Sequence, residues 1–176
     1  IAECLVGSEM CIRDSYEIEE VQDESWAKPK NTIILADKLA EQTMEKSRVT
    51  KYKKIQDLSL DDFNEITLTH PFSKLEGAES FWDYAVPLVE ADHVTDDAGT
   101  GFVHIAPSHG AEDFEVFLKR GWLSRMTNNV EDDSSFSTAV PFFKGLQIFN
   151  KKGKEGEANR AVIQKLIEAN KLIARG

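Results

Sequence analysis

The densest group of chemically versatile side chains in this sequence lies between Asp92 and Phe117, in the run DHVTDDAGTGFVHIAPSHGAEDFEVF. His104 and His109 can exchange protons near neutral pH, and the carboxylate of Asp113 can accept hydrogen bonds. Apolar residues 102–106 predict a strand, and a turn and then helical spacing follow. A strand–turn–helix unit would bring both imidazoles and the carboxylate to one pocket mouth, so this stretch is the candidate site.

Each of these residues also has a structural explanation. A histidine in a strand, such as His104, is often a hydrogen-bonded core residue, and His109 lies in a turn where exposure is common. Asp113 falls in the first turn of the expected helix, where an acid gains about 0.3 to 1 kcal/mol from the helix dipole without any function. The residues alone leave both interpretations open.

A metal site is the main chemical alternative. His93, His104, His109 and Asp113 could bind zinc and activate water for hydrolysis. A proline and a glycine interrupt the stretch, however, so the histidines lack the spacing of ligands on one helix face. The sequence therefore favours a site without a metal. It contains no nucleophile elbow, P-loop or dinucleotide pattern, and Gly99–Gly101 is only a turn signal.

Composition predicts one soluble domain. The chain has 176 residues, of which 41% are hydrophobic and 30% charged, and it carries a net charge of -10. That charge opposes a surface devoted to nucleic acid, so RNA contacts must be local, at lysine clusters within 28–30, 51–54 or 151–154. No segment resembles a membrane span or a signal peptide, so we expect a cytoplasmic protein without a membrane partner.

The first fifteen residues are atypical. The run CLVGSEMCIRDS at 4–15 resembles a translation of the adapter DNA used to build sequencing libraries. We expect residues 1–15 to be an artefact and disordered. The rest of the chain contains no cysteine, which fits a reducing compartment.

Hydrophobic periodicity predicts a strand-rich domain with few helices. Two amphipathic patterns predict helices at 37–46 and from Ala158 to about Asn170, and the polar segment 123–139 predicts a surface loop whose length indicates a function. The segments expected to be strands are 16–22, 32–35, 51–58, 65–69, 85–91, 102–106 and 172–174.

The motif GTGFVHIAPSHGAEDF resembles the editing domain inserted into class I aminoacyl-tRNA synthetases, specifically of the isoleucyl type. ILADKLAEQTM, LTHPF and ADHVT resemble family segments in the expected order, so the resemblance covers about Tyr16 to Gly176. Valyl and leucyl relatives differ both at the position of His104 and at that of Gly110. The resemblance implies an α+β, β-rich fold, with an antiparallel barrel-like core and peripheral helices, forming an editing domain at 16–176 that is truncated at both ends.

The resemblance also implies an activity and partners. One missing methylene gives a synthetic pocket only about 10- to 200-fold discrimination, an argument for which isoleucyl enzymes are the standard example. The editing domain would therefore hydrolyse valine wrongly attached to the isoleucine tRNA. Its partners would be the tRNA acceptor end, the mischarged valine and the rest of the synthetase chain.

Family roles carry over to matching positions. Asp113 would accept hydrogen bonds from the α-ammonium group of the substrate, and His104 would border the side-chain pocket and exclude isoleucine. Gly99, Thr100 and Gly101 would help to hold the terminal adenosine. His109 would contact the substrate, and it remains a candidate general base.

One departure from the family is large. Family members have a threonine-rich WTTTPWTLPAN segment upstream of Tyr16, where this chain has the adapter-like run, so we expect impaired hydrolysis. The HIGH and KMSKS motifs are absent too. ATP and magnesium are therefore expected as cofactors of the parent enzyme, and none is expected for this domain. A tRNA-docking module without chemistry is the remaining alternative.

Overall fold

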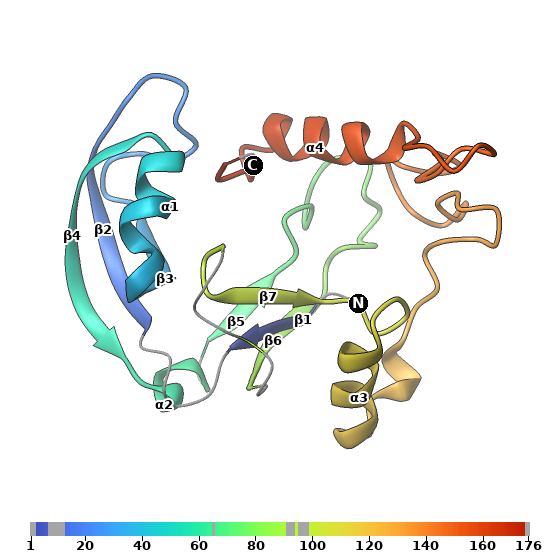
Figure 1. The fold of residues 1–176 in the computed structure, drawn as a ribbon, viewed down its shortest axis with the longest axis horizontal. Coiled ribbons are helices and arrows are strands. Elements are labelled where there is room, and N and C mark those ends of the chain that lie inside the picture. The colour runs from blue at the N-terminus through green and yellow to red at the C-terminus, as the bar shows by residue number, and fades with distance from the viewer. Residues whose placement is uncertain (1–2, 7–12, 65, 91–93, 95–98, 175–176) are drawn as a thin grey trace.

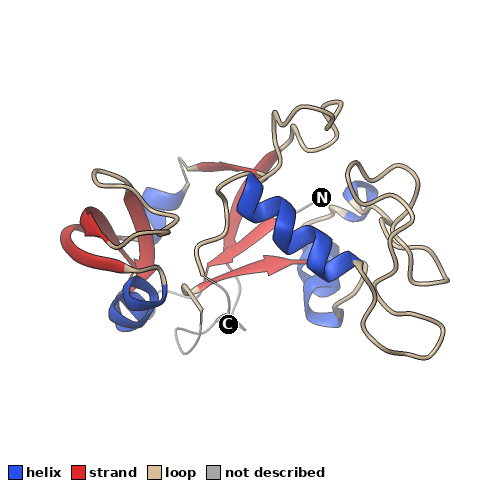
Figure 2. Ribbon diagram, turned by 90° about the horizontal axis from the view of Figure 1, so that it is seen from above, coloured by secondary structure: helices blue, strands red, loops and turns tan. Residues whose placement is uncertain are grey.

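The computed structural model describes residues 3–6, 13–64, 66–90, 94 and 99–174. Their strands form two sheets, one of four strands in the order β5-β6-β1-β7 and one of three in the order β3-β2-β4. Figure 2 shows the three-stranded sheet at one end of the molecule, the other sheet in the middle and long loops at the far end. The domain is therefore mixed α/β and strand-rich, as the sequence predicts.

The three-stranded sheet contains the expected hairpin. Its strands are β2 (Arg13–Val21), β3 (Thr32–Ala36) and β4 (Val49–Leu58), and β2 pairs antiparallel with both neighbours. The 3-10 turn η1 (Asp37–Leu39) and helix α1 (Ala40–Lys46) follow β3, because the apolar residues of this segment recur at helical spacing. Alternate side chains of the strands meet those of α1 in a core that includes Ile18, Leu35 and Met44.

The four-stranded sheet carries the candidate site. Its strands are β1 (Glu3–Val6), β5 (Thr67–Thr69), β6 (Ala85–Glu90) and β7 (Phe102–Ile105). The β1–β7 and β5–β6 pairs are antiparallel, whereas β1 and β6 are parallel. The expectation of an antiparallel core therefore holds for most pairs but not for this one. Among the described residues, the strand pairing gives two sheets.

In the described part of the chain, three further α-helices lie outside the sheets, where Figure 1 shows them. Helix α2 (Leu60–Phe63) has a capping box made by Ser59 and Asp62. Helix α3 (Ala111–Lys119) packs Phe117 against Val89 and Ile105 of the four-stranded sheet. Helix α4 (Ala158–Glu168) covers an aromatic cluster, whose buried members are Phe72, Ala78, Trp82, Val140 and Phe143. No helix in the described part of the chain is long and apolar enough to cross a membrane.

Two local expectations differ from the structure. Residues 172–174 form no strand, because the chain leaves α4 through Asn170 with a left-handed φ of 54° and finds no partner strand there. Residues 3–6 and 13–15 were expected to be disordered, but they lie in β1 and β2, and the side chains of 13–15 are buried. Residues 7–12 lie outside the described residues. The adapter origin of this segment stays a prediction.

Candidate functional site

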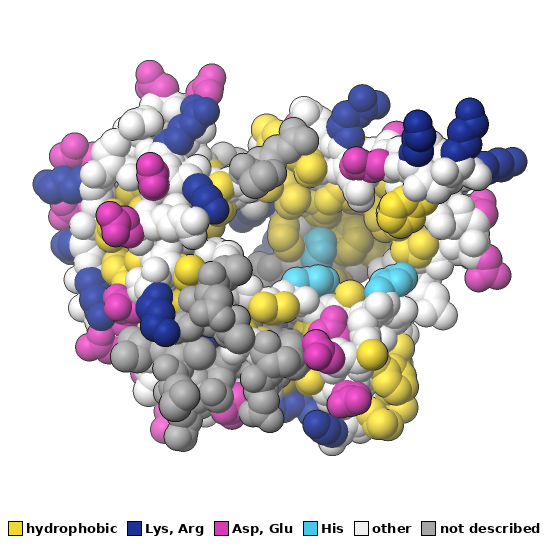
Figure 3. All heavy atoms as spheres, in the orientation of Figure 1, with side chains coloured by type: hydrophobic (Ala, Val, Ile, Leu, Met, Phe, Trp, Pro, Cys, Tyr) yellow, Lys and Arg dark blue, Asp and Glu magenta, His cyan; other side chains and the backbone are white. Residues whose placement is uncertain are grey.

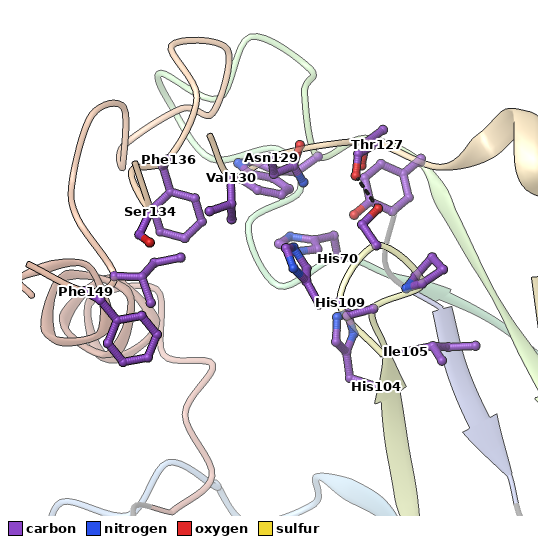
Figure 4. Close-up of a pocket in the computed structure, with 16 residues that line it drawn as sticks. His70, His104, Ile105, His109, Thr127, Asn129, Val130, Ser134, Phe136 and Phe149 are labelled. Atoms are coloured by element: carbon purple, nitrogen blue, oxygen red, sulfur yellow. Dashed lines mark hydrogen bonds between the residues drawn. The ribbon is translucent and has the colours of Figure 1, made fainter. Parts of the chain in front are cut away.

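A pocket of about 590 Å³ lies between the end of β7 and the loops that precede α4. Its size is within the range of small-molecule sites. His70, His104 and His109 line it, and Figure 3 shows histidine side chains around a hollow in the surface. In Figure 4 the three rings lie together on one side of the cavity, and Phe136 and Phe149 lie on the other. The two histidines chosen from the sequence therefore share one cavity.

The β7–turn–α3 unit positions these groups as the sequence predicts. The backbone N–H groups of His109 and Gly110 donate to the carbonyl of Ala106, at 2.8 and 3.0 Å, and close the turn. The carboxylate of Asp113 accepts a hydrogen bond of 2.8 Å from the N–H of Ala106. A Cβ atom at Gly110 would stand 2.9 Å from that carboxylate, so the glycine leaves room for it.

Asp113 does not itself line the pocket. It lies directly behind the wall, because its hydrogen-bond partner Ala106 is a lining residue. Its charge also reaches His104. The surrounding protein displaces water and lowers the pKa of the His104 imidazole below its usual value, and the negative charge of Asp113 opposes this effect. Asp113 and His104 thus lie on the same side of the fold and interact electrostatically.

The Gly99–Gly101 turn lies elsewhere. None of its residues lines the pocket, and its three carbonyl groups bond to the three-stranded sheet and its helix. The carbonyl of Gly99 accepts from the Thr43 hydroxyl at 3.1 Å, and that of Thr100 from the N–H of Ala36 at 2.9 Å. Arg13 donates to the carbonyl of Gly101. In this structure the turn joins the two halves of the domain.

His70 lines the pocket, although the sequence patterns do not predict it as a site residue. It follows β5 and belongs to the LTHPF segment, which carried the family resemblance but no expected role. Its ring stacks on Trp82 with centroids 4.3 Å apart and planes 13° apart. Burial, with a smaller effect of nearby His104, lowers the pKa of His70 to about 4. The only sequence feature that indicates His70 is its position just before the Pro-Phe pair of the LTHPF segment.

The loop predicted at 123–139 forms the opposite wall. Thr127, Asn129, Val130 and Phe136 line the pocket, and an isolated bridge pairs Val130 with Phe136. The Ser108 hydroxyl donates to the carbonyl of Thr127 at 2.9 Å, which ties this loop to the turn after β7 (Figure 4). The polar segment is therefore a structured wall of the site.

The alternative of a metal site has no matching set of ligands in the part of the chain that is described. No group of three or more His, Cys, Asp or Glu side chains there could hold an ion. His93, one of the four proposed ligands, lies outside the described residues.

Comparison with known proteins shows that the chain is similar in sequence to isoleucine–tRNA ligases. It is 40% identical over 168 residues to the isoleucine–tRNA ligase of Bradyrhizobium diazoefficiens, a match that covers 92% of this chain. It is 44% identical to that of Ruegeria pomeroyi, over 92% of the chain, and 43% identical to that of Caulobacter vibrioides, over 90%. The matched segment is 16 to 17% of these relatives, so the chain spans about one sixth of their length.

No model of a protein family matches the chain. Among solved structures, one described as the crystal structure of GlLeuRS-CP1 is similar, with a TM-score of 0.47 and 19% identity. The match covers 70% of this chain and 42% of the chain in that structure.

Proposed function

Because this chain is homologous to one segment of the isoleucine–tRNA ligases, we propose that it is the editing domain of such an enzyme. Its reaction is hydrolysis of the ester that joins valine to the isoleucine tRNA. The observation that carries the proposal is the pocket lined by His104 and backed by Asp113, within a segment 40% identical to these ligases.

Asp113 and His104 have different roles in this proposal. Asp113 accepts a hydrogen bond from Ala106 in the pocket wall, and an ionised carboxylate suits an ammonium ion. His104 is neutral at pH 7 because its pKa lies below the usual value. It therefore acts through the bulk of its ring, which limits the space left for the side chain of the substrate.

The reaction needs positioning more than a protein nucleophile. Water adds to the ester carbonyl, the bond between the carbonyl carbon and the ribose oxygen breaks, and that oxygen takes a proton. Valine leaves as a free amino acid. The Ser108 hydroxyl is engaged with Thr127, so it is not poised as a nucleophile. The hydroxyl groups of the terminal ribose orient the water in our proposal, and His109 is the candidate base.

The remaining partners follow from the same proposal. The acceptor end of the tRNA enters beside Phe149, where exposed Lys151, Lys152 and Lys154 offer local positive charge for its phosphates. The rest of the ligase chain supplies activation with ATP and magnesium, and this domain uses no cofactor. The whole enzyme works in the cytoplasm.

Deacylation of valyl-tRNA(Ile) tests the proposal. We expect slow release of valine by the chain as it stands, and faster release when residues 4–15 are replaced by the corresponding segment of the Bradyrhizobium ligase. Asp113→Asn preserves an oxygen for the N–H of Ala106 but removes the charge. It should lower the rate of the restored chain by about 10- to 100-fold, because charge-assisted hydrogen bonds contribute about 1.5 to 3 kcal/mol.

Three outcomes would contradict the proposal. An unchanged rate in Asp113→Ala would remove the site assignment. Loss of activity on chelation would favour the metal-dependent hydrolase. Binding of tRNA by the restored chain without any release of valine would indicate a docking module.

A further inference from the structure

Aromatic contacts surround the His70 ring in the wall of the pocket. Its ring stacks on Trp82 and makes tilted contacts with Phe72 and Tyr84, at centroid distances of 5.4 and 5.9 Å. Trp82 is itself buried in the aromatic cluster beneath α4. The aromatic contacts fix the plane of the imidazole, so its two nitrogens point in defined directions.

One of those nitrogens is committed to the backbone. The N–H of Phe72 donates to Nδ1 of His70 at 3.1 Å. A backbone N–H can only donate, so Nδ1 accepts and carries no proton. A neutral imidazole has one N–H, which must then be at Nε2. Because burial lowers the pKa of this ring to about 4, the neutral form dominates at physiological pH.

The Nε2–H group is available to a ligand. Among the described residues no hydrogen bond joins Nε2 to a protein acceptor, and the ring lines the pocket beside His104 and His109. Charged groups nearby do not change this assignment, since His104 is also held neutral and Asp113 contacts the wall through Ala106. The pocket thus contains a fixed, uncharged donor on the histidine side of the cavity.

We propose that His70 binds the substrate directly, by donating a hydrogen bond from Nε2 to an oxygen of the aminoacyl ester. This inference rests on the proposed function and adds a contact to it. A neutral donor suits an ester oxygen, because it stabilises the partial charge there without giving up a proton. Trp82 and the N–H of Phe72 keep the ring oriented before the substrate arrives.

Two substitutions of His70 distinguish loss of the Nε2 donor from loss of the acceptor for the N–H of Phe72. In His70→Asn the amide oxygen can still accept from the N–H of Phe72, but no donor reaches the position of Nε2. In His70→Gln the longer amide can donate near that position. The probe is valyl-adenosine with an amide in place of the ester, which cannot be hydrolysed by water at a useful rate. We expect binding to weaken about three- to tenfold in His70→Asn and to remain within about twofold in His70→Gln.

Nitrogen-15 NMR of the imidazole in the full 176-residue chain gives a readout that is independent of turnover. We expect the Nε2–H tautomer at pH 7 and a shift of the Nε2 resonance on adding the probe. A proton on Nδ1, or equal affinity of the wild type and His70→Asn, would overturn the role of His70 while the proposed function stands. If the wild type binds no probe and neither it nor the restored chain releases valine, the proposed function fails and this inference fails with it.

Discussion

At the scale of single residues, the proposed function depends on the space that the imidazole ring of His104 occupies. His104 lines the pocket, whereas its neighbour Val103 points to the opposite face of β7 and is 41% exposed. The proposed function makes His104 a barrier to the larger substrate. Removing the ring should therefore change which amino acid is released, and not only how fast.

We expect His104→Ala in the restored chain to release isoleucine from isoleucyl-tRNA(Ile). The ratio of the isoleucine rate to the valine rate should rise by about tenfold or more, because pockets discriminate between side chains that differ by one methylene by about 10- to 200-fold. Parallel deacylation assays with both charged tRNAs measure the ratio, and Val103→Ala is the control. An unchanged ratio in His104→Ala would show that another group limits the pocket.

The shifted pKa of His70 also predicts how stability depends on pH. The folded-state pKa of about 4 lies below the usual value of 6.5, so between these values the unfolded chain binds a proton that the folded chain does not. The contribution of the neutral His70 ring to the free energy of unfolding is complete above pH 6.5 and is lost as pH falls toward 4. At pH 5 the loss should be about 1 to 2 kcal/mol, allowing for the partial exposure of the ring.

Urea unfolding at pH 7.5 and pH 5.0 measures this effect. The free energy of unfolding of the wild type should fall more between the two values than that of His70→Asn, which has no titrating group at this position. Equal losses in the two proteins would mean that His70 does not titrate as a buried neutral ring.

At the scale of elements, the glycine turn before β7 connects the two sheets. Gly99 and Gly101 both have left-handed φ angles, of 70° and 80°. Their surroundings differ, because a Cβ atom at Gly101 would stand 2.5 Å from the Cβ of Ala36, while nothing lies within 4 Å of one at Gly99. The close approach of Gly101 lets β7 lie against the end of β3.

We expect Gly101→Ala to destabilise the domain more than Gly99→Ala. Both substitutions should lower the free energy of unfolding by about 1 kcal/mol, because alanine disfavours a positive φ. Gly101→Ala should cost about 1 to 3 kcal/mol more, because Ala36 must move. Thermal or urea unfolding measures the difference. Equal costs would indicate that the two sheets are less closely joined than the contact at Gly101 implies.

At the scale of the whole molecule, the N-terminal segment contains one buried polar group that is incompletely paired. The side chain of Asp14 is completely buried in β2, and its Oδ1 atom has no hydrogen-bond partner. Burial raises the pKa of this carboxyl, although Lys54 lies 2.6 Å from its other oxygen. A buried carboxylate that is only partly paired costs free energy. A substitution that removes this carboxylate is therefore expected to be tolerated or to stabilise the domain.

Replacing residues 4–15 by the corresponding segment of the Bradyrhizobium ligase should therefore raise Tm. Asp14→Leu alone tests how much of the gain comes from the carboxylate. It should be neutral or stabilising, since Lys54 keeps Asp57 at 2.5 Å and Tyr16 keeps Asp37 at 2.9 Å. Differential scanning calorimetry of the three proteins checks this. A lower Tm after the replacement would mean that the present segment is the better partner for its neighbouring strands β3, β4, β6 and β7.

The sequence alone determined those features that depend on short stretches of chain. The hairpin, the helix after it and the strand–turn–helix unit with His104, His109 and Asp113 all follow from local periodicity and turn residues, and each is present. The family resemblance also came from contiguous motifs. Such features are predictable because the residues that cause them lie within a few positions of one another.

Only the tertiary structure decided how distant segments combine. His70 entered the pocket because Trp82 and Phe72 hold its ring there, and the loop at 127–136 became the opposite wall. Gly99–Gly101 became the junction between the sheets because its carbonyls meet Thr43, Ala36 and Arg13. These roles depend on hydrogen bonds and packing between residues far apart in the chain, which no local pattern records.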